Sequence, residues 1–206
     1  MKTSVALAAL LLTLTACGSD DDEPTAVDPG PQPAAMPSAA PVPAGPVRTV
    51  RLATVLDTGE GAELCLGPVA ESFPPQCSGP AITNWDWDEH GQEMFDEQDP
   101  VRWGTYAVTG SWDGTAFEVT DTVPGPLYDA MAPEPSPTPS PSASYSEAEL
   151  ESVAADLRAL PGAQGAVSDG TTVTADVLYD DGTLQAWADE EYGAGLVLVS
   201  SLLVNV

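Results

Sequence analysis

Proline-rich stretches divide this chain and limit where it can fold. Segment 133–141 has Pro at every second position, and Pro lacks a backbone N–H and holds φ at about −65°. Such a segment favours an extended polyproline II conformation and forms no core. Residues 19–46 are also dominated by Pro, Ala, Gly and Ser, and they bury too little apolar surface to offset the entropy of ordering. We therefore expect two small folded units, at 47–129 and 145–206, joined by the linker 130–144.

The amino-terminal residues carry a targeting pattern. Lys2 precedes an apolar run of about ten residues, which is too short for a membrane span because a spanning helix needs about 20. Residues 1–16 are therefore expected to be a signal peptide. The sequence Leu14-Thr15-Ala16-Cys17 resembles the bacterial lipobox, in which small residues precede a Cys that receives a diacylglyceryl group. This predicts that Cys17 is lipidated and that residues 17–46 form a disordered tether at the outer face of the cell membrane.

The charge balance excludes one class of function. The chain has 5 Lys and Arg residues against 32 Asp and Glu residues, which gives a net charge of −27. A nucleic-acid reader needs a basic stripe to contact phosphates, and the few basic residues of this chain are scattered. Nucleic-acid binding is therefore excluded. The acidic surface favours solubility, and it also fits attraction of cations or of a basic partner.

The unit at 47–129 is expected to be a small all-β, barrel-like domain. Residues 47–56 and 101–110 are rich in Val, Thr and aromatic residues, and Asp113-Gly114 is a strong hairpin signal before 115–120. The unit also contains Cys65 and Cys77. In an exported chain whose third Cys carries a lipid, these two have only each other as partners, so we expect a disulfide.

The unit at 145–206 is expected to be a two-layer α/β domain with the order α-β-β-α-β, which makes the whole chain α+β. Ser146 and Glu149 form a capping box before a first helix that stops at Pro161-Gly162. Asp169-Gly170 predicts a second hairpin. A second helix, with Leu184, Trp187 and Ala188 on its apolar face, is expected to end at Gly193, and residues 195–206 read as one final strand. We expect the two units to move independently about 133–141, without a shared core.

Several short motifs resemble a family of uncharacterised actinobacterial exported lipoproteins. The resemblance covers both expected units and implies an envelope location, but it carries no known activity. The motifs are Leu64-Cys65-Leu66-Gly67-Pro68, Pro74-Pro75-Gln76-Cys77-Ser78-Gly79-Pro80, Trp85-Asp86-Trp87, Trp103-Gly104-Thr105-Tyr106 and Asp181-Gly182-Thr183-Leu184-Gln185-Ala186-Trp187.

An acidic loop at 85–99 is the candidate metal site. Asp86, Asp88, Gly91 and Glu97 fall at positions 1, 3, 6 and 12 of the calcium-loop pattern. His90 departs from that pattern at position 5, because it offers nitrogen to a hard cation, and the flanking segments do not look helical. The loop is therefore either a calcium site that uses Asp86, Asp88 and Glu97 or a solvated acidic turn.

No catalytic set is visible in the sequence. His90 is the only His, no G-x-S-x-G nucleophile motif accompanies it, and two Cys twelve residues apart do not make a zinc site. Trp85 and Trp87 either fill the core or form a platform for a glycan or a protein. The leading hypothesis is a non-enzymatic binding or interaction lipoprotein of the cell envelope. The alternatives are a calcium-binding envelope protein and an envelope hydrolase whose carboxylate site the sequence does not reveal.

Overall fold

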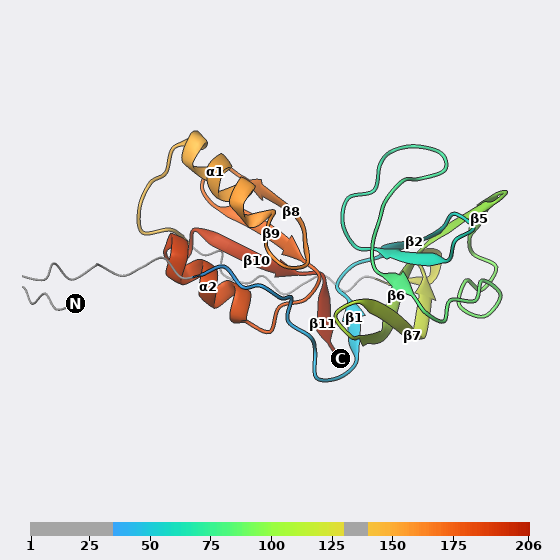
Figure 1. Cartoon of the computed structure of the whole chain (residues 1–206). Helices are drawn as coiled ribbons and strands as arrows, with labels where there is room; N and C mark the ends of the chain where they lie inside the picture. The colour runs from blue at the N-terminus through green and yellow to red at the C-terminus, as the bar shows by residue number, and fades with distance from the viewer. Residues whose placement is uncertain (1–34, 130–139) are drawn as a thin grey trace, which may run out of the picture. The chain divides into compact units, whose positions relative to one another are not determined.

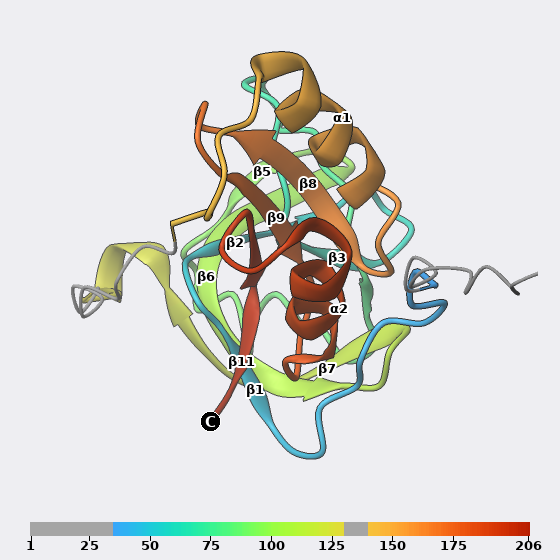
Figure 2. The same cartoon turned by 90° about the vertical axis from the view of Figure 1, so that its left-hand side faces the viewer.

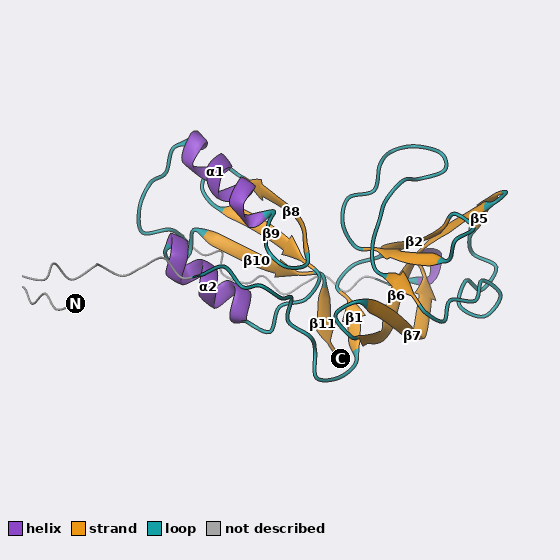
Figure 3. Ribbon diagram, in the orientation of Figure 1, coloured by secondary structure: helices purple, strands orange, loops and turns teal. Residues whose placement is uncertain are grey.

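The computed structural model describes residues 35–129 and 140–206. Cys17, the expected signal peptide and most of the linker 130–144 lie outside these residues. The described residues form the α+β fold expected from the sequence, with an eight-stranded sheet and a separate three-stranded sheet accompanied by two α-helices (Figure 1, Figure 3). Residues 35–46, which were expected to belong to the tether, contain no helix or strand.

Five strands of the larger sheet close into a barrel. Their order around the barrel is β6, β2, β3, β4 and β7, and the β6–β7 pairing closes the ring. The β4–β7 pairing is parallel, whereas the other pairings in the ring are antiparallel. Strand bounds are Ala53–Asp57 for β2, Ala62–Cys65 for β3, Ala81–Ile82 for β4, Val101–Trp112 for β6 and Ala116–Pro124 for β7. The expected barrel-like domain is thus present, with β1 (Val47–Thr49), β5 (Asp96–Gln98) and β11 (Leu203–Asn205) added to it.

The barrel interior is filled by alternate side chains of its strands. Tyr106 and Phe117 are fully buried there, together with Val55, Leu64 and Val108. The Tyr106 hydroxyl donates a hydrogen bond to the Met94 carbonyl at 3.1 Å. Burial, with a smaller contribution from Asp96, raises the pKa of Tyr106 to about 12, so this hydroxyl stays protonated and keeps its hydrogen bond at neutral pH.

The turn between β6 and β7 follows the expected Asp113-Gly114 signal. Gly114 adopts φ +95°, a conformation that a residue with a Cβ rarely takes. The Asp113 carboxylate accepts hydrogen bonds from the backbone N–H groups of Thr115 at 2.7 Å and Ala116 at 2.8 Å. The side chain therefore holds the turn that sets the register of the longest strand pair in the barrel.

The second sheet carries two helices on one face. Its order is β10 (Val197–Ser201), β9 (Val173–Val177) and β8 (Ala163–Ser168), with β10 parallel and β8 antiparallel to β9. Apolar residues of all three strands pack against helices α1 (Glu147–Leu157) and α2 (Thr183–Tyr192). The Ser146–Glu149 capping box that starts α1 is confirmed, as is the end of α2 at Gly193.

Side chains bond to backbone groups on both outer strands of this three-stranded sheet. On β10, the Gln185 side chain donates to the Val197 carbonyl at 3.0 Å and accepts from the Val199 N–H at 2.8 Å. On β8, the Arg158 guanidinium donates to the Ala166 carbonyl at 3.0 Å. These contacts occupy backbone groups that an uncovered edge strand would offer to another chain.

The expectation of a single strand at residues 195–206 is wrong. The run divides at Leu202 into β10, which belongs to the three-stranded sheet, and β11 (Leu203–Asn205), which pairs antiparallel with β1 (Val47–Thr49) in the larger sheet. Figure 1 and Figure 2 both show β11 beside β1. The Leu202 N–H donates to the Val177 carbonyl at 2.9 Å, and its carbonyl accepts from the Val50 N–H at 3.0 Å. Both backbone groups of Leu202 are therefore hydrogen-bonded where the chain passes from the smaller sheet to the larger one.

Because the chain changes sheets, residues of the carboxyl-terminal unit form part of the barrel core. Leu178, Tyr179, Leu202 and Leu203 pack in the same apolar cluster as the barrel residues. Each of the four is buried. The expectation that the two units share no core is therefore wrong. The division into domains at 47–129 and 145–206 stays a prediction.

Replacing Leu203 by Ala should lower the free energy of unfolding by about 2–5 kcal/mol, because a fully buried Leu leaves a cavity when it is truncated. Urea denaturation of the whole protein measures this loss. Val206→Ala is the matched control, since Val206 is 76% exposed one residue past β11. A loss below about 1 kcal/mol for Leu203→Ala would mean that β11 contributes little to the barrel.

Acid should weaken the two hairpin turns. Backbone N–H groups of Ala116 and Thr115 lower the pKa of Asp113 below its ordinary 3.8, and those of Thr172 and Thr171 do the same for Asp169. A carboxyl whose folded pKa is depressed stabilises the fold above its unfolded pKa and loses that contribution as pH falls through the folded pKa. We expect the free energy of unfolding to fall below about pH 4. The fall should be smaller in Asp113→Asn than in the control Asp129→Asn, and equal profiles would contradict the assignment.

Candidate functional site

The acidic loop at 85–99 is organised around Asp86. Its carboxylate accepts hydrogen bonds from the backbone N–H groups of Asp88 at 2.8 Å and Glu89 at 3.1 Å. Its own N–H donates to His90 Nδ1 at 3.1 Å, and its carbonyl accepts from the His90 N–H at 2.8 Å. Asp86 and His90 therefore close a turn, in which the carboxylate acts on the local backbone.

The two Trp residues of this loop pack onto the barrel core. Trp87 is buried, and its indole N–H donates to the Asp57 carboxylate at 3.3 Å. Trp85 lies edge-on to Trp87 and to Tyr106, with ring centroids 5.3 and 5.2 Å apart, and it stacks on the His90 ring at 5.4 Å. The core-filling interpretation therefore holds for this pair, and His90 serves the packing of the loop.

The calcium ligands suggested by the sequence do not form a group. Glu97 lies on β5 (Asp96–Gln98) and accepts a hydrogen bond from Arg102 at 2.9 Å, while Asp86 binds backbone N–H groups of its own turn. In residues 35–129 and 140–206, no three His, Cys, Asp or Glu side chains come together so that they could hold a metal ion. The calcium hypothesis stays a prediction, and the structure gives it no ligand set.

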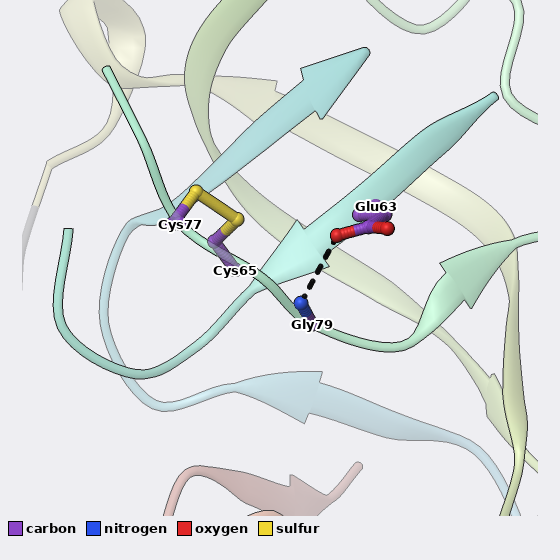
Figure 4. Close-up of a disulfide and its surroundings, with 4 residues drawn as sticks. All are labelled: Glu63, Cys65, Cys77 and Gly79. Carbon is purple, nitrogen blue, oxygen red and sulfur yellow. Dashed lines mark hydrogen bonds between the residues drawn. A yellow bond between two sulfur atoms is a disulfide. The ribbon is translucent and has the colours of Figure 1, made fainter. Parts of the chain in front are cut away.

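The expected disulfide is confirmed. Cys65 at the end of β3 bonds to Cys77, with the two Cα atoms 6.0 Å apart (Figure 4). Beyond Cys77, the Gly79 N–H donates to the Glu63 carboxylate at 3.3 Å. A Cβ on Gly79 would overlap the Leu64 carbonyl, so only Gly lets the returning chain lie this close to β3. The disulfide and this contact hold the 65–79 loop against the barrel.

A groove lies where this loop meets the open face of the three-stranded sheet, and we call it the Arg51 groove. Its volume is about 300 Å³. Five of its nine lining residues are Gly, Pro, Ala or Val, and the other four have polar side chains. The lining residues are Arg51, Gly67, Pro68, Gln164, Gly165, Ala166, Val167, Thr174 and Asp176. An apolar pocket with a few polar groups, formed between two structural units, is the common setting of a ligand site.

Opposite charges meet in the Arg51 groove. Arg51 donates from Nη2 to Asp176 Oδ2 at 3.4 Å, and the two side chains are 60% and 36% exposed. A single long contact between half-exposed groups contributes little to stability. Within the described part of the chain, the guanidinium makes no other hydrogen bond and Oδ1 of Asp176 accepts none. Both groups therefore keep hydrogen-bonding capacity for a ligand.

A β-bulge shapes the floor of the groove. The pairing of β8 with β9 passes from Ala163 to Gly165 and skips Gln164, and bulges commonly redirect a side chain. Here the Gln164 side chain lies against Gly67, where a Cβ would come within 3.0 Å of its Oε1. Farther along β8, Val167 is 68% exposed on the groove side.

Sequence reasoning missed this groove. Arg51 and Asp176 are 125 residues apart, and neither belongs to a motif. The one signal was Arg51 itself, a rare cation in an acidic chain. The sequence did not show that Asp176 lies beside Arg51, because the two residues belong to units that the pairing of β11 with β1 joins.

We expect no saturable heat when calcium is titrated into the protein at submillimolar concentration, because Glu97 is paired with Arg102 and Asp86 is engaged by its own turn. Isothermal titration calorimetry makes the measurement. Saturable heat that disappears in Asp88→Asn, and persists in the control Glu151→Gln on α1, would instead establish the calcium site.

The chain was compared with known protein families, proteins and structures. No family model matches it, and searches of curated proteins and of solved structures find no significant match. The resemblance to actinobacterial exported lipoproteins stays a prediction.

Proposed function

We propose that this protein is a lipid-anchored, extracytoplasmic binding protein of the cell envelope, without catalytic activity of its own. The observation that carries the binding role is the Arg51 groove. The lipobox-like sequence at Cys17 carries the location. The two parts of the proposal rest on separate observations and are tested separately.

The anchor is supported by the chemistry of the amino terminus. A thiol that follows small residues is the nucleophile that takes a lipid in a lipobox, and each buried CH₂ of an acyl chain contributes about 0.8 kcal/mol to membrane binding. Two or three chains on Cys17 would hold the protein durably. In the described residues, neither helix has the length and apolar character of a membrane span.

The disulfide supports an exported location. Cys65 and Cys77 lie in bonding geometry at the edge of the barrel, and disulfides persist in oxidising compartments, whereas the cytosol keeps thiols reduced. Closure of a loop of this length contributes roughly 3 kcal/mol, which is substantial for a small barrel.

Binding is supported over catalysis by the groove lining. Its polar side chains are one guanidinium, one carboxylate, one amide and one hydroxyl, from Arg51, Asp176, Gln164 and Thr174. These groups orient a ligand by hydrogen bonds and charge. Nucleophilic catalysis needs a base beside its hydroxyl or thiol, and among the described residues the groove's one carboxylate, Asp176, contacts Arg51 and makes no hydrogen bond to the Thr174 hydroxyl.

Replacing Cys17 by Ser should abolish incorporation of a fatty-acid analogue and release the protein from the membrane fraction, because Ser offers no thiol for the lipid. In-gel fluorescence after metabolic labelling makes the measurement. Cys77→Ser is the matched control, since it also removes a Cys but leaves the lipobox unchanged. Equal labelling of wild type and Cys17→Ser would disprove lipid anchoring.

A further inference from the structure

We propose that the Arg51 groove binds an aliphatic α-amino acid as the zwitterion, with the ligand carboxylate on Arg51 and the ligand ammonium on Asp176. This inference rests on the binding role proposed above and names the class of ligand. It does not depend on the lipid anchor.

The charge geometry fits a zwitterion. An α-amino acid carries its carboxylate and ammonium on one carbon, so it needs two opposite charges side by side, and Arg51 and Asp176 lie 3.4 Å apart. The planar guanidinium matches a carboxylate in a bidentate pair, and such charge-assisted bonds are the stronger ones. When a zwitterion binds, the long contact between Arg51 and Asp176 would be replaced by two shorter ion pairs, one from each side chain to the ligand.

The charge of the whole protein favours a neutral ligand over a simple ion. With a net charge of −27, the protein repels free anions from Arg51, and it attracts a simple cation to many carboxylates besides Asp176. A zwitterion has no net charge, so it is not repelled. Of the anion, the cation and the zwitterion, only the zwitterion is attracted by both charges of the groove.

The size and the apolar wall fit an aliphatic side chain. A volume of about 300 Å³ lies at the lower end of the usual range of ligand pockets, which favours a single small molecule. Val167, which is 68% exposed, and the exposed Pro68 supply apolar surface beside the ion pair. Burial of a branched aliphatic side chain against such a wall contributes to binding without any further polar contact.

An extended peptide fits this region less well. Peptides commonly dock by adding a strand to an open sheet edge, but Arg158 and Gln185 occupy edge groups of β8 and β10. The groove opens on the sheet face, where β9 lies between its two neighbours. The geometry therefore points to a free amino acid.

Three small probes test the inference on the mature chain, residues 17–206, with Cys17→Ser to omit the lipid. L-leucine carries both charges, 4-methylpentanoate lacks the ammonium, and 3-methylbutylamine lacks the carboxylate. Calorimetry should give saturable heat with leucine and at least tenfold weaker binding of each truncated probe. No saturable heat with millimolar leucine, or equal binding of all three probes, would overturn the proposal.

Two variants locate the site. Asp176→Asn should weaken leucine at least tenfold and should not weaken 4-methylpentanoate, whereas Arg51→Gln should weaken both. The controls Glu151→Gln and Arg48→Gln remove the same charges at exposed positions outside the groove and should leave leucine binding unchanged. Leucine binding that survives both groove variants places the site elsewhere and refutes the proposal. If a groove variant fails to fold, the comparison of the three probes on the wild-type protein still tests whether the ligand is a zwitterion.

The proposals for the lipid anchor and for the ligand are tested by separate experiments. Loss of leucine binding with intact lipid labelling of Cys17 would reject the ligand class and keep the envelope location. Leucine binding without lipid labelling of Cys17 would reject the envelope location and keep the ligand class.

Discussion

The pairing of β11 with β1 is the interaction on which the rest of the structure depends. It places Leu202 and Leu203 in the barrel core and ties the last residues of the chain to the first strand. The Val206 N–H extends the tie to the Pro46 carbonyl at 3.1 Å. Because the barrel is small, each buried side chain that this pairing adds matters to its apolar core. The two walls of the Arg51 groove stay together because this strand passes between the units.

Local signals in the sequence predicted local structure well. The Ser146–Glu149 capping box and the turn at Asp113-Gly114 depend on residues a few positions apart, and both appear as expected. The Cys65–Cys77 pairing was also predictable, because counting left no other partner in a chain that was expected to be exported and lipidated on its third Cys. Each of these features is determined by the chemistry of one short segment.

Long-range pairing was not predictable in the same way. Residues 195–206 are mostly apolar, and the Ser200-Ser201 pair before Leu202 does not by itself show that the chain changes sheets there. Strand β4 has two residues and joins β7 in parallel, which is too short for a periodicity signal. The candidate site shares this limit. The acidic loop matched a metal pattern by residue type, but its carboxylates bind the backbone and Arg102, whereas Arg51 and Asp176 meet only after folding.

The covered edges of the three-stranded sheet matter most where the protein is crowded. Copies that share a membrane surface meet at a far higher local concentration than copies in dilute solution, so even a weak tendency of strands to pair would be amplified. Gln185 and Arg158 satisfy edge groups of β10 and β8 from within the same molecule. If the proposed anchor holds the protein at a membrane, these two side chains would reduce strand pairing between neighbouring copies, an effect that would not be seen in dilute solution.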